Sequence, residues 1–397
     1  MNTLFKRKVV SQICQRLAEP RRFIQVVSGP RQVGKTTAVF QALEECGLQN
    51  RFVSADDPNL NSVEWIRTEW EQARLEQNRT KGDFVFVIDE IQKIPEWSAM
   101  VKLMWDQDTR KKQPLKIILT GSSSLLLQKG IKESLMGRFE LLFCTHWNFA
   151  ECKEAFGYTL DDFLYFGGYP GAAVLRKNEE RWRRYIASSI VEPSISQDIL
   201  FMEEVRKPAL MRALFTLGAS YSGQELSYTK ILGQLQDAGN TVTIAHYLEL
   251  LAKANILCGL QKFSENKLQV KQSSPRFMVF DTSLMTYSYG ASKKSFLENQ
   301  TAKGHLVESA VGSYLLAKAR EENFEVYWWR DRDKEVDFVL KKGKSITALE
   351  VKSGRVKHIG GYLDFKKKYP QARCLVIGDS NCSLEDFLLG KVTFYIS

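Results

Sequence analysis

The segment 29–36 constrains the fold of this chain more than any other. It reads Gly-Pro-Arg-Gln-Val-Gly-Lys-Thr, the P-loop pattern G-x-x-x-x-G-K-T. The apolar run 23–27 before it predicts a strand, and 37–42 after it predicts the start of a helix. Gly29 and Gly34 let the backbone curl so that its N–H groups face phosphates, and the helix start adds a positive dipole end. A glycine turn that matches by chance is the alternative, and the strand and helix on either side disfavour it.

A P-loop assigns a role to each of its residues. Lys35 would reach the β- and γ-phosphates of ATP, and the Thr36 hydroxyl would ligate Mg²⁺. The expected nucleotide-binding residues of this segment are Gly29, Pro30, Arg31, Gln32, Val33, Gly34, Lys35, Thr36 and Thr37.

A second motif lies at 84–90, where the continuous apolar run Phe-Val-Phe-Val-Ile ends in two acids. Such a run predicts a strand that is buried on both faces, hence a parallel sheet. The acids at its end fit the Walker B pattern. Asp89 would hold Mg²⁺, and Glu90 would polarise the attacking water. A buried strand that happens to end in surface acids is the alternative.

Two further segments have candidate roles at a nucleotide site. The buried strand expected at 115–119 ends in small polar residues, of which Thr120 or Ser122 could sense the γ-phosphate; turn formation explains them equally well. Arg138 follows a glycine and could act as an arginine finger on a nucleotide in a neighbouring subunit. The alternative is a surface arginine in a salt bridge.

These motifs together resemble a known family. The runs GPRQVGKTT, FVFVIDEIQKIPEW, ILTGSSS and MGRFE, followed by GGYP at 167–170, are similar to a widespread bacterial and archaeal group of AAA-type ATPases. Its members carry a C-terminal domain of unassigned function, and the resemblance spans nearly the whole chain. It implies that Lys35, Thr36, Asp89 and Glu90 form the nucleotide site and that Arg138 is a finger. Serine replaces asparagine at the sensor position, which bears on the hydrolysis rate more than on binding.

Length and composition limit the number of domains and the class of protein. A chain of 397 residues predicts about two to three domains. No apolar run approaches the ~18 residues of a membrane span, and no apolar segment of a signal peptide follows the basic residues near the N-terminus. We therefore expect a soluble cytoplasmic protein without a membrane partner. The seven scattered cysteines predict reduced thiols.

Positive charge concentrates in the second half. The formal net charge is +1 over 1–204, +5 over 205–299 and +4 over 300–397. This favours a nucleic-acid partner for the second half, DNA first, although ordinary solubility charge would account for it too.

The middle of the chain predicts helices. Segment 171–215 would form a helical lid over the nucleotide, and 226–238 with 240–255 predicts a helix-turn-helix. The hairpin expected at 256–280 completes a winged helix. Its second helix begins without arginine, lysine or glutamine, so sequence-specific DNA reading is disfavoured. The hairpin could still grip phosphates, or the winged helix could serve only for packing between domains. The basic residues of the hairpin are Lys262, Lys267, Lys271 and Arg276.

The last hundred residues predict the order α-β-β-β-α-β after a polar linker at 296–303. Asp337 on the second strand, with Glu350 and Lys352 on the third, resembles the PD-(D/E)xK nuclease fold. Alternation places Glu350 and Lys352 on one strand face. Asp337 and Glu350 would bind Mg²⁺, Lys352 would orient a water, and Glu308 could be a third acid. A fold that persists as a non-catalytic module is the alternative.

The fold class expected is therefore α/β. A P-loop ATPase domain (1–160) is followed by a helical lid (161–215), a winged helix (216–295) and a restriction-endonuclease-like domain (296–397). The function expected is an Mg²⁺-dependent ATPase whose nucleotide state controls the C-terminal DNA-binding or nuclease-like domains. Two alternatives remain: an ATP-gated switch that binds a protein partner through an inactive nuclease fold, and a ring-forming translocase or remodeller, hence a homo-oligomer.

Overall fold

A computed structural model describes residues 5–56, 62–80, 82–121, 134–200, 205–235, 239–264, 274–352 and 360–394. The chain folds into two compact units, residues 1–145 and 146–397, and each is described by itself.

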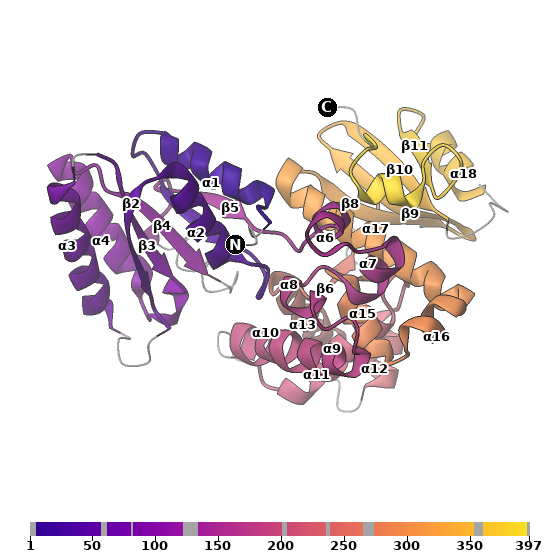
Figure 1. The fold of residues 1–397 in the computed structure, drawn as a ribbon. Helices are drawn as coiled ribbons and strands as arrows, with labels where there is room; N and C mark the ends of the chain where they lie inside the picture. Colours follow the sequence, from indigo (N-terminus) through magenta and orange to yellow (C-terminus); the bar gives the residue numbers. More distant parts are fainter. Residues whose placement is uncertain are drawn as a thin grey trace. The chain divides into compact units, whose positions relative to one another are not determined.

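The first unit is a five-stranded parallel sheet in the order β2-β3-β4-β1-β5 (Figure 1). Parallel pairing confirms the expectation from the continuous apolar runs. Its strands are β1 (Ile24–Ser28), β2 (Gln49–Ser54), β3 (Phe84–Asp89), β4 (Lys116–Gly121) and β5 (Phe139–Phe143). Its helices are α1 (Lys8–Ala18), α2 (Lys35–Cys46), α3 (Val63–Arg79), the 3₁₀ turn η1 (Ile91–Lys93) and α4 (Trp97–Lys111).

Helices cover both faces of this sheet. Alternate side chains of β3 point to opposite sides, so Phe86 packs with Trp70 of α3 and Trp105 of α4, while Val87 packs with Ile13 of α1 and Val39 of α2. In Figure 1, α3 and α4 lie together on one side of the sheet. Three layers result, with both faces of the central strands buried.

The second unit begins with helices. They are α6 (Phe149–Phe156), α7 (Leu160–Phe166), α8 (Pro170–Ala173), α9 (Glu179–Tyr185), the π-helical η2 (Ile186–Val191), α10 (Glu192–Ile195), the π-helical η3 (Ser196–Leu200) and α11 (Pro208–Ser220). The helix pair expected for the winged helix is present as α12 (Tyr228–Gln234) and α13 (Thr241–Lys253). It is followed by the antiparallel strands β6 (Leu257–Leu260) and β7 (Arg276–Val279).

The linker expected at 296–303 is wrong. After α15 (Thr282–Tyr289) the chain forms α16 (Lys293–Glu298) and the long α17 (Gln300–Glu322) with only Asn299 between them. Phe296 is fully buried and its ring packs against Tyr165 and Tyr289. The single aromatic in a polar stretch was the signal that this segment packs.

The C-terminal elements follow the expected order α-β-β-β-α-β. The strands β8 (Glu325–Asp331), β9 (Lys334–Lys342) and β10 (Ser345–Val351) are antiparallel neighbours, and β11 (Arg373–Ile377) pairs parallel with β10. Helix α18 (Gly360–Lys368) lies between β10 and β11 in the chain, and α19 (Leu384–Leu388) is an addition that the sequence did not predict.

The described residues that follow β6 pack into the C-terminal sheet. Phe263, just after β6, lies in one hydrophobic cluster with Trp329, Phe365 and Tyr369. Its N–H donates to the carbonyl of Trp328, whose indole Nε1 donates to Leu260 O at 3.1 Å. These described residues of the hairpin therefore form internal contacts, as the packing alternative expected.

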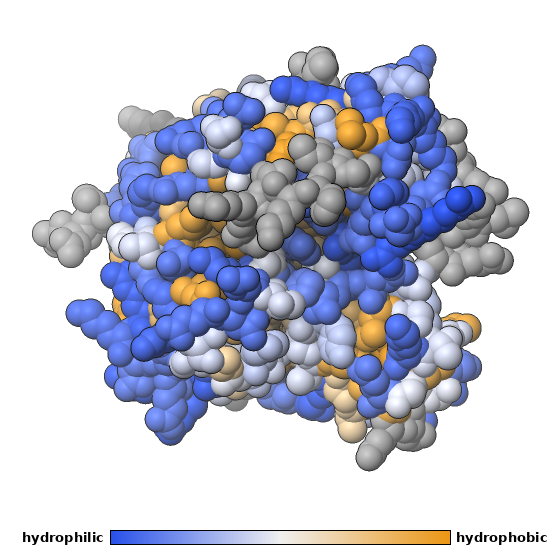
Figure 2. Space-filling view, turned by 90° about the vertical axis from the view of Figure 1, so that its right-hand side faces the viewer, coloured by the Kyte–Doolittle hydropathy of each residue, from blue (hydrophilic) through white to orange (hydrophobic). Residues whose placement is uncertain are grey.

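No helix in the described part of the chain is long and apolar enough to cross a membrane. On the face that Figure 2 shows, hydrophobic residues appear as separate patches among hydrophilic ones.

Candidate functional site

The P-loop lies at the carboxyl end of β1, in the position that its motif predicts. Gly29 has φ +156° and Gly34 has φ +88°, conformations that glycine adopts without steric cost. A Cβ on Gly29 would also lie 2.1 Å from the carbonyl oxygen of Cys144, so no other residue fits there. Helix α2 begins at Lys35, so the last two residues of the P-loop form its first turn.

Three strand ends place the polar side chains of the site. Strand β4 lies between β1 and β3, so Thr120, near its carboxyl end, stands between the P-loop and the acids of β3. Thr36 Oγ1 is 3.2 Å from both carboxylate oxygens of Asp89, and Thr120 Oγ1 donates to Oδ1 of Asp89. Lys35 is buried and its Nζ donates to Gly29 O at 3.2 Å and Pro30 O at 2.7 Å.

Burial raises the pKa of Asp89, and the hydrogen bonds from Thr120 and Thr36 counteract the shift. A hydroxyl oxygen and a carboxylate side by side form the hard-oxygen set that Mg²⁺ prefers. The residues fit the ion: Thr36 and Asp89 would hold it, and it would supply charge neutralisation for the β- and γ-phosphates.

Glu90 adopts the left-handed region, with φ 52° and ψ 37°. This conformation is uncommon outside glycine and occurs often at functional sites. Its N–H lies 3.4 Å from Thr120 Oγ1, and its Oε2 accepts a hydrogen bond from Gln92. Glu90 is thus held next to Asp89 by its own backbone and by a neighbouring amide.

Arg7 and Thr120 are residues of this site that sequence reasoning underestimated. Arg7 is buried, and its Nη1 donates to Val33 O at 3.3 Å and to Thr145 O at 3.0 Å. It therefore links the P-loop to Thr145, the last residue of the first unit. Its place before the first helix gave no signal of that contact. Thr120 was one of two sensor candidates; the other, Ser122, lies outside the described residues.

Arg138 lies at the amino ends of the strands, whereas the P-loop of the same chain lies at their carboxyl ends. It directly precedes β5, whose first residue pairs with the first residue of β1, whereas the P-loop follows the last. Its guanidinium forms a bidentate ion pair with Asp106, with Nε–Oδ1 at 2.8 Å and Nη2–Oδ2 at 3.1 Å. Within one chain it therefore has the salt-bridge role, and a finger role would require a neighbouring subunit.

The second unit brings the predicted nuclease-like residues together. Phe338 of β9 pairs with Leu349 of β10, which places Asp337 beside Glu350. Val351 N donates to Asp337 Oδ2 at 2.7 Å, and Lys352 forms an ion pair with Glu350. Burial and the carboxylate of Glu308 raise the pKa of Asp337 to about 8. Burial likewise raises the pKa of Glu350, against the effect of Lys352.

Arg276 enters this acidic cluster from β7, which corrects its expected role in gripping phosphates at the surface. Its side chain is 7% exposed. Nη2 is 2.7 Å from Glu335 Oε1 and 3.6 Å from Glu308 Oε2, and Nη1 is 3.5 Å from Asp337 Oδ1. Among the described residues no group of three or more acidic, histidine or cysteine side chains is arranged to hold a metal ion. The Mg²⁺ expected at Asp337 and Glu350 therefore does not fit this arrangement.

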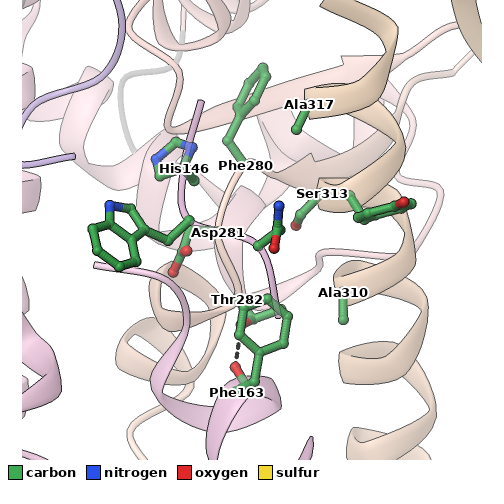
Figure 3. A pocket seen from close by; sticks show the side chains of 11 residues that line it. His146, Phe163, Phe280, Asp281, Thr282, Ala310, Ser313 and Ala317 are labelled. Carbon is green, nitrogen blue, oxygen red and sulfur yellow. Dashed lines mark hydrogen bonds between the residues drawn. The ribbon is translucent and has the colours of Figure 1, made fainter. Parts of the chain in front are cut away.

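The GGYP segment is a packing joint. Asp281 is buried and its carboxylate accepts from Gly168 N at 2.7 Å and Ser283 N at 3.0 Å. A small pocket beside it is lined by His146, Phe163 and Thr282 and by one face of α17, as Figure 3 shows. A volume of about 30 Å³ has room for water only. The segment positions helices and offers no ligand site here.

The parallel sheet, the P-loop, and the acid pair at the end of β3 define a P-loop nucleotide-binding domain of the AAA type. Residues 21–153 match the family model described as "AAA domain", 157–295 match a domain of unknown function (DUF8612), and 303–394 match another (DUF4143). The chain thus carries an AAA domain followed by two domains without an assigned function.

Individual proteins add little to this assignment. An uncharacterised protein of Methanocaldococcus jannaschii is 25% identical over 357 residues, which cover 84% of this chain and 76% of that protein. The Aeropyrum pernix ORC1 protein, solved in complex with DNA, is 11% identical, with 73% of this chain and 93% of that chain covered and a TM-score of 0.32. The Thermotoga maritima RuvB Holliday junction branch migration motor is 16% identical, with 63% and 88% covered and a TM-score of 0.34. Similarities of this size carry no argument about function.

Thr120 gives the first test of the site. Thr120→Val keeps the shape of the side chain but removes the donor to Asp89, and we expect the Mg²⁺-dependent part of ATP affinity to fall about 10- to 100-fold. Titration with a fluorescent ATP analogue, with Mg²⁺ and with EDTA, measures it. Thr68→Val, in which an exposed hydroxyl bonded to Glu64 O is lost, is the control. Equal Mg²⁺ dependence in the two variants would contradict the role of Thr120.

Proposed function

We propose that the first unit binds Mg²⁺–ATP and hydrolyses it, and that its nucleotide state controls how the second unit engages its partner. The observation that carries the proposal is the contact of Thr36 with Asp89, with Glu90 next to it in a constrained conformation. A metal-binding hydroxyl, a metal-binding carboxylate and a water-polarising carboxylate then meet at one sheet edge.

The residues divide the work of phosphoryl transfer. The backbone amides of 29–36 cradle the phosphates, together with the start of α2. The Lys35 ammonium exchanges its bonds to the loop carbonyls for the β- and γ-phosphate oxygens, and it stabilises the charge that develops there. Glu90 accepts a hydrogen bond from the attacking water and orients it. Arg138 would act on a nucleotide of a second copy, after it releases Asp106.

DNA is the partner that the charge distribution favours, because residues 205–397 carry nine of the ten net positive charges. The second candidate is an ATP-gated regulator of a protein partner whose nuclease-like domain is inactive. The arginine inside the acidic cluster favours this candidate, since it occupies oxygens that a catalytic metal would need.

A turnover assay tests the ATPase. We expect wild type to hydrolyse ATP and Lys35→Ala to lose about 100-fold or more, because an ammonium that stabilises the transition state is removed. Lys111→Ala, at the exposed end of α4, is the control with the same loss of charge. Stimulation by duplex DNA that depends on Lys35 supports the DNA partner, and unchanged rates favour the protein-partner candidate. A Lys35→Ala protein as active as wild type would overturn the catalytic assignment.

A further inference from the structure

The first unit ends beside its own P-loop. Strand β5 pairs in parallel with β1, with Phe143 opposite Ser28, so both strands leave the sheet at the same edge. Cys144 N then donates to Ser28 O at 2.7 Å, and Thr145 is the last residue of the unit. The chain therefore passes the beginning of the P-loop just before it enters the second unit.

Main-chain atoms make the contact between these two segments. A Cβ on Gly29 would lie 2.1 Å from the carbonyl oxygen of Cys144 and 3.1 Å from its carbonyl carbon. The Cys144 side chain is buried in a hydrophobic cluster that also contains Val27, just before the loop, and Val33 within it. Main-chain atoms cannot move aside by a rotamer change, so the loop and Cys144 hold each other in place.

Arg7 joins the same two segments by hydrogen bonds. Its Nη1 carries two N–H groups, which reach Val33 O at 3.3 Å and Thr145 O at 3.0 Å. All three residues are buried, where a bond from a charged donor is stronger than it would be in water. One side chain thus holds the middle of the P-loop and the end of the first unit together, and its removal would take this donor from both carbonyls at once.

The position of Arg7 is fixed by its own surroundings. It stands directly before α1, where its carbonyl accepts from Val10 N at 2.9 Å. The carbonyl of Phe5, two residues earlier, accepts from Gln41 Nε2 of α2 at 3.2 Å. Because α2 begins with the last residues of the P-loop, Arg7 is anchored on the element that carries the loop.

Nucleotide binding acts on the loop end of this bridge. In the proposed function the Lys35 ammonium exchanges Gly29 O and Pro30 O for phosphate oxygens, and the phosphates bind the curled form of the loop. Local opening of the loop would release the ligand, so bound nucleotide makes such openings rarer. Because Arg7 and the main-chain contacts belong to the loop and to segment 144–145 alike, the same ligand makes openings of that segment rarer.

We propose that Arg7 couples nucleotide occupancy of the P-loop to the order of residues 144–145, where the first unit ends. Arg7 is thus a positioning residue, since it acts through Val33 O and Thr145 O. The inference rests on nucleotide binding in the proposed function and deepens it, because it names the route by which the nucleotide state leaves the site. It requires no hydrolysis.

Hydrogen–deuterium exchange of the Cys144 amide tests the coupling, with and without a non-hydrolysable ATP analogue and Mg²⁺. With the analogue at about 100 times its Kd, openings that release it become about 100-fold rarer, so wild-type exchange at Cys144 should slow by about 10- to 100-fold. Arg7→Met removes both hydrogen bonds and keeps an unbranched side chain, and we expect it to lose this slowing. The amides of Lys35 and Thr36 should still slow in the variant as they do in wild type.

Two controls make the comparison specific. Calorimetry gives the Kd of each protein, so that all are compared at equal occupancy, and it shows separately whether the nucleotide site binds at all. Arg22→Met makes the same change at an exposed arginine at the amino end of β1, and its exchange at Cys144 should slow as in wild type. If Arg7→Met does not fold, as judged by circular dichroism, Arg7→Gln replaces it, with a polar, uncharged and shorter side chain.

Three results would overturn the coupling. Exchange at Cys144 in wild type could be insensitive to bound nucleotide, or it could slow equally in wild type and in a folded Arg7 variant. Loss of the slowing at both Cys144 and Lys35 would assign Arg7 to the loop alone. A wild type that binds no analogue by calorimetry would overturn the nucleotide site itself, and with it the coupling that rests on that site.

Discussion

Replacing Glu90 by glutamine should stop ATP turnover and leave ATP binding intact. Glutamine keeps the size of the side chain and loses the charge that polarises water, which costs about 10²- to 10⁴-fold for a general base. Binding should survive because the phosphates and Mg²⁺ contact Lys35, Thr36 and Asp89. Single-turnover hydrolysis and calorimetric ATP titration measure the two quantities separately.

The chain offers a matched control for this variant. Glu96 also has a positive φ, 55°, and is exposed at the start of α4, so Glu96→Gln makes the same chemical change in the same backbone conformation. Its turnover should equal that of wild type. If Glu90→Gln still turned over at more than about a tenth of the wild-type rate, another base would have to serve. Lost ATP binding would instead mean that Glu90 shapes the loop.

The nucleotide site was the most predictable part of the molecule. Its residues lie close together in sequence at the ends of buried strands, and parallel strands bring their carboxyl ends to one edge. The same logic predicted Asp337 beside Glu350 on adjacent strands. Local spacing does not reveal contacts between residues that are distant in sequence. The ion pair between Arg276 and Glu335, which are 59 positions apart, therefore could not be predicted from the pattern. Glu335 itself shares a strand face with Asp337 and could have been found by alternation.

Two sequence predictions were wrong because polar residues were expected to be exposed to solvent. The polar stretch at 296–303 forms helix because Phe296 anchors it in an aromatic cluster. Arg276 was grouped with surface lysines, although a guanidinium is the cation best suited to burial among carboxylates. Tertiary partners that are distant in sequence decided both cases, Tyr165 for the helix and Glu335 for the arginine.

The second large expected effect is on stability, and it tests whether the GGYP segment serves for packing. A Cβ on Gly168 would lie 2.1 Å from the carbonyl oxygen of Trp147, which is backbone and cannot rotate away. Gly168 N also donates to the buried carboxylate of Asp281. We therefore expect Gly168→Ala to lower the free energy of unfolding of the second unit by about 3 kcal/mol, through forced backbone shifts and a weakened hydrogen bond.

Gly233→Ala gives the opposite expectation with the same chemical change. This exposed glycine of α12 has no atom within 4 Å of the place that an added methyl carbon would take, so alanine should stabilise by about 0.5–1 kcal/mol through lower chain entropy. Urea denaturation followed by far-ultraviolet circular dichroism measures both variants. ATP binding by the first unit should be unchanged in each, since neither glycine belongs to it. If Gly168→Ala were as stable as wild type, the backbone at Trp147 would have to shift at little energetic cost, which would contradict the tight packing inferred for the GGYP segment.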